Sequence, residues 1–437
     1  MHATPCSVAF RKENKMKWQF PNSLALGTFF LTSATGMRSF LQAIVFLIIV
    51  RILDIREYGV YSAVAALAIA LGSLVGLGVH FIMVREVARN RQLFPQAWGW
   101  TRATLVISAP FFYAIYLLFS WLVFPVHIPW GVIILLGLSE LICTPIILSV
   151  IHAYQSQERM EKAAYILFIP VIPRLISALI CGVLTLIFPQ GVYLLLWSTL
   201  YFLSSVIATF YIFHFALIDF GSGVSSDWKT IREKIITGLP FALSSFALRL
   251  YTDIDKTLLA RFATLEETGA YSAANRLVDL ALLPIISLLM TATPDFFRAG
   301  ATGISQALAY SRRLLPLPAL FSLLISCVIF WGADVLIWLL GSGYQRTILS
   351  LRWLAWLPCI SLPRLFLQAV FSGSDLQHYS GGVLILGAGL NIILNLWLIP
   401  IWGWRGAVIV TYATECAISC ALFLIVALRR PKIADVQ

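Results

Sequence analysis

VRILDIREYGVYSA at residues 50–63 and ARFATLEETGAYSA at residues 260–273 are two similar segments, 210 residues apart. Each joins what we expect to be the first helix of a six-helix set to the second. Six is an even number, so both sets have the same orientation in a membrane, and parallel repeats of this kind occur in secondary transporters with the substrate site between them. Chance similarity of two turns is the alternative. Six of the fourteen aligned positions are identical: Arg51/Arg261, Glu57/Glu267, Gly59/Gly269, Tyr61/Tyr271, Ser62/Ser272 and Ala63/Ala273.

The composition around this repeat is that of a membrane protein. Of 437 residues, 60% are hydrophobic and 12% are charged, and the mean hydropathy is +0.88. A soluble globular protein is about 25% charged, so this chain has too few charges to cover a soluble fold. A bilayer needs no polar coat around the protein. The sequence therefore predicts an all-α integral membrane protein that crosses the bilayer many times.

We predict about twelve transmembrane helices in two parallel six-helix bundles around a central cavity. Each apolar stretch is near the ~20 residues that a crossing needs. The turn Pro189-Gln190-Gly191 splits one long apolar stretch into two crossings. The predicted organisation is a cytoplasmic segment 1–22, an N-terminal bundle 23–217, a cytoplasmic linker 218–237, a C-terminal bundle 238–428 and a cytoplasmic tail 429–437. The predicted crossings are 23–50, 58–84, 98–124, 130–151, 163–188, 191–217, 238–260, 271–293, 314–340, 348–371, 381–400 and 406–428.

Lysine and arginine set the orientation. With both termini inside, nineteen basic residues fall on the cytoplasmic side and six on the other, which is a strong positive-inside bias. The six are Arg51, Arg56, Arg261, Arg346, Arg405 and, at a helix edge, Arg352. The net charge of +11 thus reflects topology and contact with lipid headgroups, and no nucleic acid is expected as a partner.

Several other functions are not supported by any motif. No phosphate-cradling G-x-x-x-x-G-K-[ST] motif occurs, so the chain has no ATP site of its own. Its seven cysteines include no C-x-x-C pair and have no histidine at a metal-like spacing, so we expect neither metal nor other cofactor. The connections are too short for a soluble catalytic domain, and we expect no catalytic residues. Met16 reads as a natural start, and the basic lead before it is no secretory signal.

Several motifs resemble one family. Arg51–Tyr61, RILDIREYGVY, is similar to the R-x-L-x-x-x-x-Y/F-G-x-Y turn after the first helix of polysaccharide flippases. Gly76-Leu-Gly78 with Arg85-Glu-Val-Ala88 resembles that family's second-helix exit, and Asp255-Lys256 with Gly269–Ala273 its helix 7–8 signature. Pro400–Ala407, PIWGWRGA, matches its P-x-x-G-x-x-G-A turn. The resemblance spans residues 23–428 and is to Wzx-type O-antigen or polysaccharide flippases of the multidrug/oligosaccharidyl-lipid/polysaccharide exporter superfamily.

This resemblance implies a function that composition does not. It implies a flippase that moves an undecaprenyl-pyrophosphate-linked oligosaccharide from the cytoplasmic to the periplasmic leaflet of a bacterial inner membrane, for O-antigen or exopolysaccharide synthesis. Polysaccharide polymerase and chain-length machinery are the partners that it suggests. Lipid II flippases of the superfamily usually carry two further helices, which are not found here. A cation-coupled multidrug exporter of the same superfamily is the alternative, and a polytopic O-antigen polymerase or ligase is a third reading.

Charged residues within the predicted crossings are the candidate site residues. Each costs at least ~2.5–3.5 kcal/mol at the bilayer centre, so it faces a cavity or a partner. Arg249, Asp253 and Lys256 share one helical face. Two interpretations remain for the acidic and lysine members near the ends of the seventh and eighth helices: a salt-bridge cluster that ties these helices together, or a coupling site. The structural or coupling set is Asp253, Asp255, Lys256, Asp279, Glu140 and Glu415.

Five arginines form the predicted substrate-binding set. Arg38 and Arg249 lie near the middle of the first helix of each half, where guanidinium groups would bind a pyrophosphate bidentately. Their alternative partners are Glu140 and Glu415, which are themselves candidates for proton exchange or for hydrogen bonds between helices. Arg174 and Arg364 each follow a proline, which frees backbone carbonyls and is tolerated beside a cavity. The predicted set is Arg38, Arg249, Arg174, Arg276 and Arg364.

Overall fold

The computed structural model describes residues 22–124, 128–188, 192–224, 227–301, 303–374 and 376–429, and within these ranges the chain is helical with no strand. The predicted segment 1–22 lies outside these ranges except for Asn22, as do the Pro189-Gln190-Gly191 turn and the tail after Arg429. The helices of the first half are α1 (Asn22–Ile52), α2 (Ile55–Gly72), α3 (Val79–Arg89), η1 (Arg91–Leu93), α4 (Phe94–Val123), α5 (Trp130–Leu138), η2 (Ser139–Cys143), α6 (Thr144–Ser156), α7 (Met160–Phe168), α8 (Val171–Ile187) and α9 (Tyr193–Phe220).

The second half continues from a short turn after α9. Here α10 begins ten residues before the predicted crossing, so most of the expected linker 218–237 is helical. The helices are α10 (Trp228–Phe262), α11 (Leu265–Gly300), α12 (Ile304–Leu314), α13 (Pro316–Leu340), η3 (Ser342–Tyr344), α14 (Thr347–Leu354), α15 (Leu357–Gly373), α16 (Gln377–Trp402) and α17 (Trp404–Arg429).

The count of crossings agrees with the prediction. Within the described residues, eleven spans are long and apolar enough to cross a membrane, and α14 with α15 makes a twelfth if this pair, bent by 42°, is one span. The second predicted crossing is broken, which the prediction of an unbroken 58–84 missed. Gly76, Leu77 and Gly78 all adopt left-handed backbone conformations between α2 and α3, and two glycines make this break possible.

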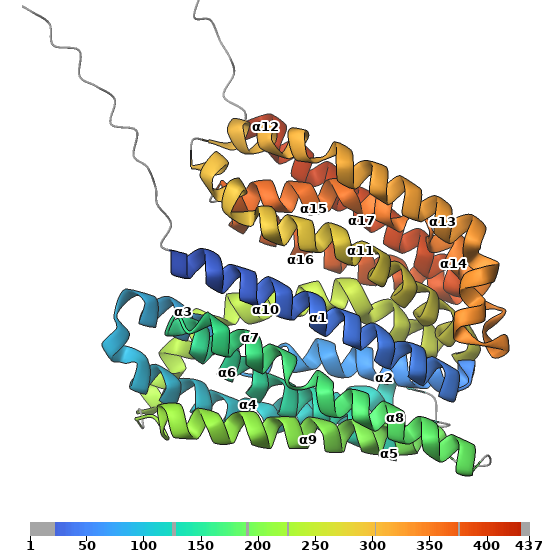
Figure 1. Ribbon diagram of the computed structural model, residues 1–437, viewed down its shortest axis with the longest axis horizontal. Helices are drawn as coiled ribbons and strands as arrows, with labels where there is room; N and C mark the ends of the chain where they lie inside the picture. The colour runs from blue at the N-terminus through green and yellow to red at the C-terminus, as the bar shows by residue number, and fades with distance from the viewer. Residues whose placement is uncertain are drawn as a thin grey trace, which may run out of the picture.

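The first helix of each half also packs against the other half. In Figure 1 the helices from α1 to α9 lie in the lower part of the view and those from α11 to α17 in the upper part. However, α1 packs against α11 and α13 as well as α7 and α8, and α10 packs against α2, α3 and α4 as well as α16. The division into two six-helix bundles, and the domain boundaries drawn from it, therefore stay predictions.

The two copies of the repeated segment pack directly against each other. Asp54 caps α2 by accepting from the backbone N–H of Glu57, and Thr264 caps α11 by accepting from that of Glu267 at 3.1 Å, so the repeat encodes two matching helix starts. The hydroxyl of Ser62 donates to that of its repeat mate Ser272 at 2.9 Å.

Glycine allows this approach between the copies. A β-carbon on Gly59 would lie 2.0 Å from the carbonyl oxygen of Leu265, and one on Gly269 would lie 1.8 Å from that of Ile55. No side chain larger than hydrogen fits either position without separating α2 from α11. Two of the six identical pairs, Gly59/Gly269 and Ser62/Ser272, therefore lie where the two copies touch.

Candidate functional site

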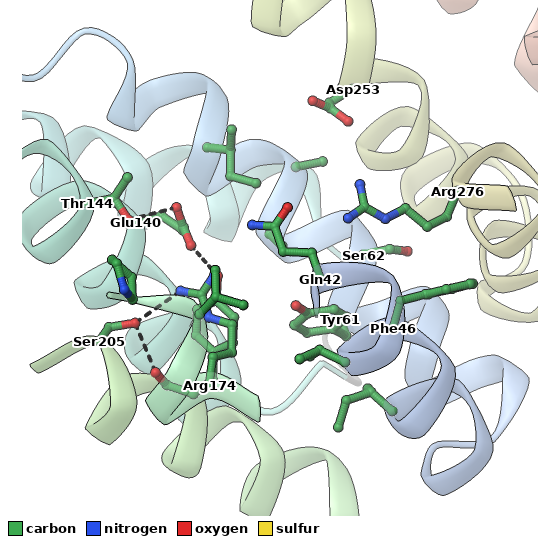
Figure 2. Close-up of a pocket in the computed structure, with 18 of the residues that line it drawn as sticks. Gln42, Phe46, Tyr61, Ser62, Glu140, Thr144, Arg174, Ser205, Asp253 and Arg276 are labelled. Carbon is green, nitrogen blue, oxygen red and sulfur yellow. Dashed lines mark hydrogen bonds between the residues drawn. The ribbon is translucent and has the colours of Figure 1, made fainter. Parts of the chain in front are cut away.

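A cavity of about 470 Å³ lies between helices of both halves (Figure 2). Its walls come from α1, α2, η2, α6, α7, α8, α9, α10 and α11. Basic side chains outnumber acidic ones among the lining residues, so the space attracts anions. The basic lining residues are Arg38, Arg174, Arg249, Lys256 and Arg276, and the acidic ones are Glu140, Asp253 and Asp279.

Arg174 lies on one wall and forms no ion pair with a carboxylate of the described residues, although Glu140 is within electrostatic reach. Its guanidinium stacks 4.0 Å from the ring centre of Tyr201, and its Nη2 donates to Ser205 Oγ at 3.3 Å. Its Nε is buried with no hydrogen-bond partner. A guanidinium in a membrane protein that is held by an aromatic ring and one hydroxyl keeps donors for an incoming acceptor.

Glu140 belongs to the same cluster and occupies the π-helical turn η2 in the middle of its crossing. Its side chain is buried, and it accepts hydrogen bonds from the hydroxyls of Tyr201 and, at 3.2 Å, Thr144 (Figure 2). Single π-helical turns are frequent at functional sites. The bond from Tyr201 of α9 is a hydrogen bond to a neighbouring helix, and a role of Glu140 in proton exchange stays a prediction.

The remaining arginines of the cavity converge from both halves. Arg38 of α1 lies within electrostatic reach of Arg174, Arg249 and Arg276, and its Nε is buried without a partner. Across the described parts of the chain, none of these four arginines forms an ion pair with a carboxylate. Neither Glu140 nor Glu415 pairs with Arg38 or Arg249, which the sequence had left as an alternative.

Among the described residues, no carboxylate of α10 or α11 lies within ion-pair distance of a basic group on the other helix, although Lys256 of α10 is within electrostatic reach of Asp279 of α11. Lys256 pairs with Asp253 one turn away on α10. Asp255 faces away from the cavity lining and accepts from the hydroxyl of Tyr271, which is the polar tie between the two helices. Asp279 accepts from Asn275 on its own helix at 3.4 Å.

Arg364 lies away from this cavity. Its Nε and Nη2 donate to the two carboxylate oxygens of Glu415 at 2.7 and 3.0 Å, and its Nη1 donates to Gln368 at 3.0 Å. Tyr251 also donates to Glu415, whose side chain is buried. The ion pair and the hydrogen bonds of this group join α10, α15 and α17. Arg364 is not among the residues that line the central cavity, contrary to its place in the predicted set.

Sequence reasoning missed the tyrosines. Tyr201 and Tyr251 hold the two buried glutamates, and Tyr61 contacts Tyr201 and Trp197 with ring centres 6.2 and 6.1 Å apart beside the cavity. Only Tyr61 carried a signal, because it belongs to the repeated segment. The described residues include no group of three or more side chains that could hold a metal ion.

Comparisons with known proteins give a family and a fold. Residues 24–299 match the family of polysaccharide biosynthesis proteins. No curated protein sequence matches this chain. Among solved structures, an inward-facing multidrug resistance MATE family transporter of the MOP superfamily is similar with a TM-score of 0.70 at 15% identity, over 93% of this chain and 98% of that one.

Two further solved structures share the fold. The outward-facing conformation of a multidrug resistance MATE family transporter gives a TM-score of 0.60 at 14% identity, over 92% of this chain and 95% of that one. A MOP superfamily transporter from Pyrococcus furiosus, described as having a binding pocket of reverse polarity that suggests a different function, gives 0.61 at 15% identity over 92% and 95%. The arrangement of helices is thus that of a multi-pass membrane protein of the MOP superfamily.

Proposed function

The chain belongs to the family of polysaccharide biosynthesis proteins, and we propose that it flips an undecaprenyl-pyrophosphate-linked oligosaccharide across a bacterial inner membrane. The family and the fold are those of transporters. The substrate enters the cavity from the cytoplasmic leaflet and leaves to the periplasmic leaflet by alternating access, with both termini in the cytoplasm. Anionic and zwitterionic membrane lipids surround the protein. Polymerase and chain-length proteins then receive the flipped lipid-linked oligosaccharide.

One observation carries this proposal: four arginines from both halves line one cavity, and none of them forms an ion pair with a carboxylate in the part of the chain that the structure describes. Charges at this depth are expensive, and a pyrophosphate supplies the missing counter-charge. Guanidinium forks bind phosphate oxygens in pairs and stay charged when water is removed. A cationic drug would be repelled by the excess of basic side chains in this cavity. This disfavours the multidrug-exporter alternative.

The test is loss of surface polysaccharide in cavity variants. Arg38→Ala and Arg249→Ala should each abolish surface polysaccharide at unchanged protein level, while Arg249→Lys keeps partial activity because it keeps the charge and loses the fork. Arg261→Ala is the matched control, since this arginine lies at the end of α10, outside the cavity lining. Normal surface polysaccharide in the Arg38→Ala, Arg249→Ala double variant would refute the proposed role of the cavity.

A further inference from the structure

A second cavity, of about 680 Å³, is lined by residues at or near the starts of α11, α14 and α17. Its lining includes Glu267 and Ala270, which follow the turn between α10 and α11. It shares no lining residue with the central cavity. The family resemblance left its Trp404 and Arg405 without a role. The lining residues are Glu267, Ala270, Gln345, Arg346, Ile348, Leu349, Arg352, Trp404 and Arg405.

Its charge is strongly positive. Arg352 pairs with Asp334 at 2.6 Å, but Arg346 and Arg405 form no ion pair with any described residue. The guanidinium of Arg405 lies 5.5 Å from the ring centre of Trp404. The one acidic lining residue is Glu267. Its carboxylate packs against Gly403, because a β-carbon on Gly403 would lie 2.6 Å from Glu267 Oε2.

The backbone adds to this charge. Arg346 and Gln345 directly precede α14, and Trp404 and Arg405 are the first two residues of α17. Neither helix has an acidic residue in its first turn, so the positive end of each helix dipole, which lies at the residues that line the cavity, is not offset by a carboxylate of its own helix. Free N–H groups at helix starts and arginine forks are two independent kinds of phosphate donor.

The location also argues for a ligand rather than for topology. Only six basic residues fall on the non-cytoplasmic side in the predicted orientation, and three of these line this one cavity. Trp404, which lines the cavity, packs against Trp353 with ring centres 5.8 Å apart, and tryptophans of this kind are enriched at membrane–water interfaces. The helices at the matching places of the first half, α5 and α9, begin with Trp-Gly-Val-Ile and Tyr-Leu-Leu-Leu, so the described first turns there carry no arginine.

We propose that this cavity is an anion site for the phosphate group of a membrane lipid at the outer interface. Arg346 and Arg405 bind the phosphate oxygens, and Trp404 lies along the glycerol or sugar next to them. The phosphate has two possible sources, an anionic phospholipid of the surrounding leaflet or the polyprenyl pyrophosphate that has just been flipped. Only the second source rests on the proposed function.

The experiment measures lipid binding to the purified full-length protein in zwitterionic nanodiscs. Phosphatidylglycerol and undecaprenyl pyrophosphate are titrated in separate arms, and retained lipid is counted by native mass spectrometry. The pyrophosphate arm uses the Arg38→Ala, Arg249→Ala background, which removes the central site. The test variant is Arg346→Gln, Arg405→Gln, and Arg261→Gln is the control because it removes an outer arginine that lies outside this cavity.

We expect the test variant to bind lipid about tenfold more weakly in at least one arm, because charged donors to phosphate are lost, with the control unchanged. Loss in the phospholipid arm identifies a resident lipid, and loss in the pyrophosphate arm identifies the product. Wild-type binding by the test variant in both arms, or an equal loss in Arg261→Gln, overturns the proposal. A failed flippase assay would leave the phospholipid arm unaffected, so the two proposals fail separately.

Discussion

The two halves of the molecule build the same trio of side chains and use it differently. In the first half Arg174 stacks on Tyr201, which donates to Glu140, and in the second half Arg364 lies over Tyr251, which donates to Glu415. Glu415 also accepts hydrogen bonds from Nε and Nη2 of Arg364. Glu140 instead accepts a hydrogen bond from Thr144 and makes no ion pair with Arg174.

The difference shows how one set of residues can form either a closed ion pair or an arginine that faces a cavity. Where the carboxylate reaches the arginine, the pair is neutral and internal, and its work is to hold helices together. Where a second hydroxyl satisfies the carboxylate, the arginine makes no ion pair with that carboxylate and lies at the wall of the central cavity. Residue type alone does not separate these outcomes, and the position of the carboxylate does.

The largest effect we expect is on stability, from Arg364→Met. This change leaves Glu415 buried with only Tyr251 as a partner, and breaking a buried ion pair costs about 3–5 kcal/mol. Unfolding of the detergent-purified protein by denaturant, followed by circular dichroism, measures the change. The double variant Arg364→Met, Glu415→Met should recover most of the loss, because no charge is then left unpaired. If the double variant is as unstable as the single one, the pair is not what stabilises this region.

Arg174→Met should reverse this pattern. Glu140 keeps the hydroxyls of Tyr201 and Thr144, so we expect a loss of stability of at most about 1 kcal/mol. Transport should fall by about a hundredfold or more, as for removal of a charged contact to substrate phosphate, and surface polysaccharide reports it. Depletion of folded Arg174→Met protein to the level of Arg364→Met would mean that the two trios are alike after all.

The comparison is sharpened where the halves are symmetric. Gly269→Ala should destabilise the protein by about 1–3 kcal/mol, since its β-carbon would overlap the carbonyl oxygen of Ile55. Gly389→Ala is the control: this glycine lies within α16 with no neighbouring atom within 4 Å of a β-carbon, so alanine should be neutral or stabilising by about 0.5–1 kcal/mol. Thermal melting of both variants in one detergent measures the difference, and equal melting temperatures would contradict the close approach of α2 and α11.

Much of this architecture follows from sequence, but the pairing of side chains does not. Apolar length gives the crossings, and the repeat gives two related halves, because both are properties of contiguous segments. The cavity positions of Arg38, Arg174, Arg249 and Arg276 follow from the price of burying a charge. Arg364 and Glu415, by contrast, are 51 positions apart in the sequence. Only tertiary packing sets the rotation of α15 and α17 about their axes that brings the two side chains together.

Two further features had weaker sequence signals. Tyr201 and Tyr251 carry no mark that separates them from the other tyrosines, of which the chain has 15. Gly76-Leu77-Gly78 is part of a family motif. The break that this segment makes in the second crossing depends on left-handed backbone angles, which a hydropathy pattern does not encode.

The smallest effect is expected at the serine pair between the repeats. Ser62→Ala removes the donor to Ser272 and should cost about 1 kcal/mol, the usual net value of one hydrogen bond. Ser62 also donates to the carbonyl of Gly59 at 3.1 Å, so the single variant alone does not isolate the contact. A double-mutant cycle with Ser272→Ala does, because only the interaction between the two hydroxyls contributes to the coupling energy. A coupling near zero would mean that the glycines hold the halves together and that the serines merely fill the space between them.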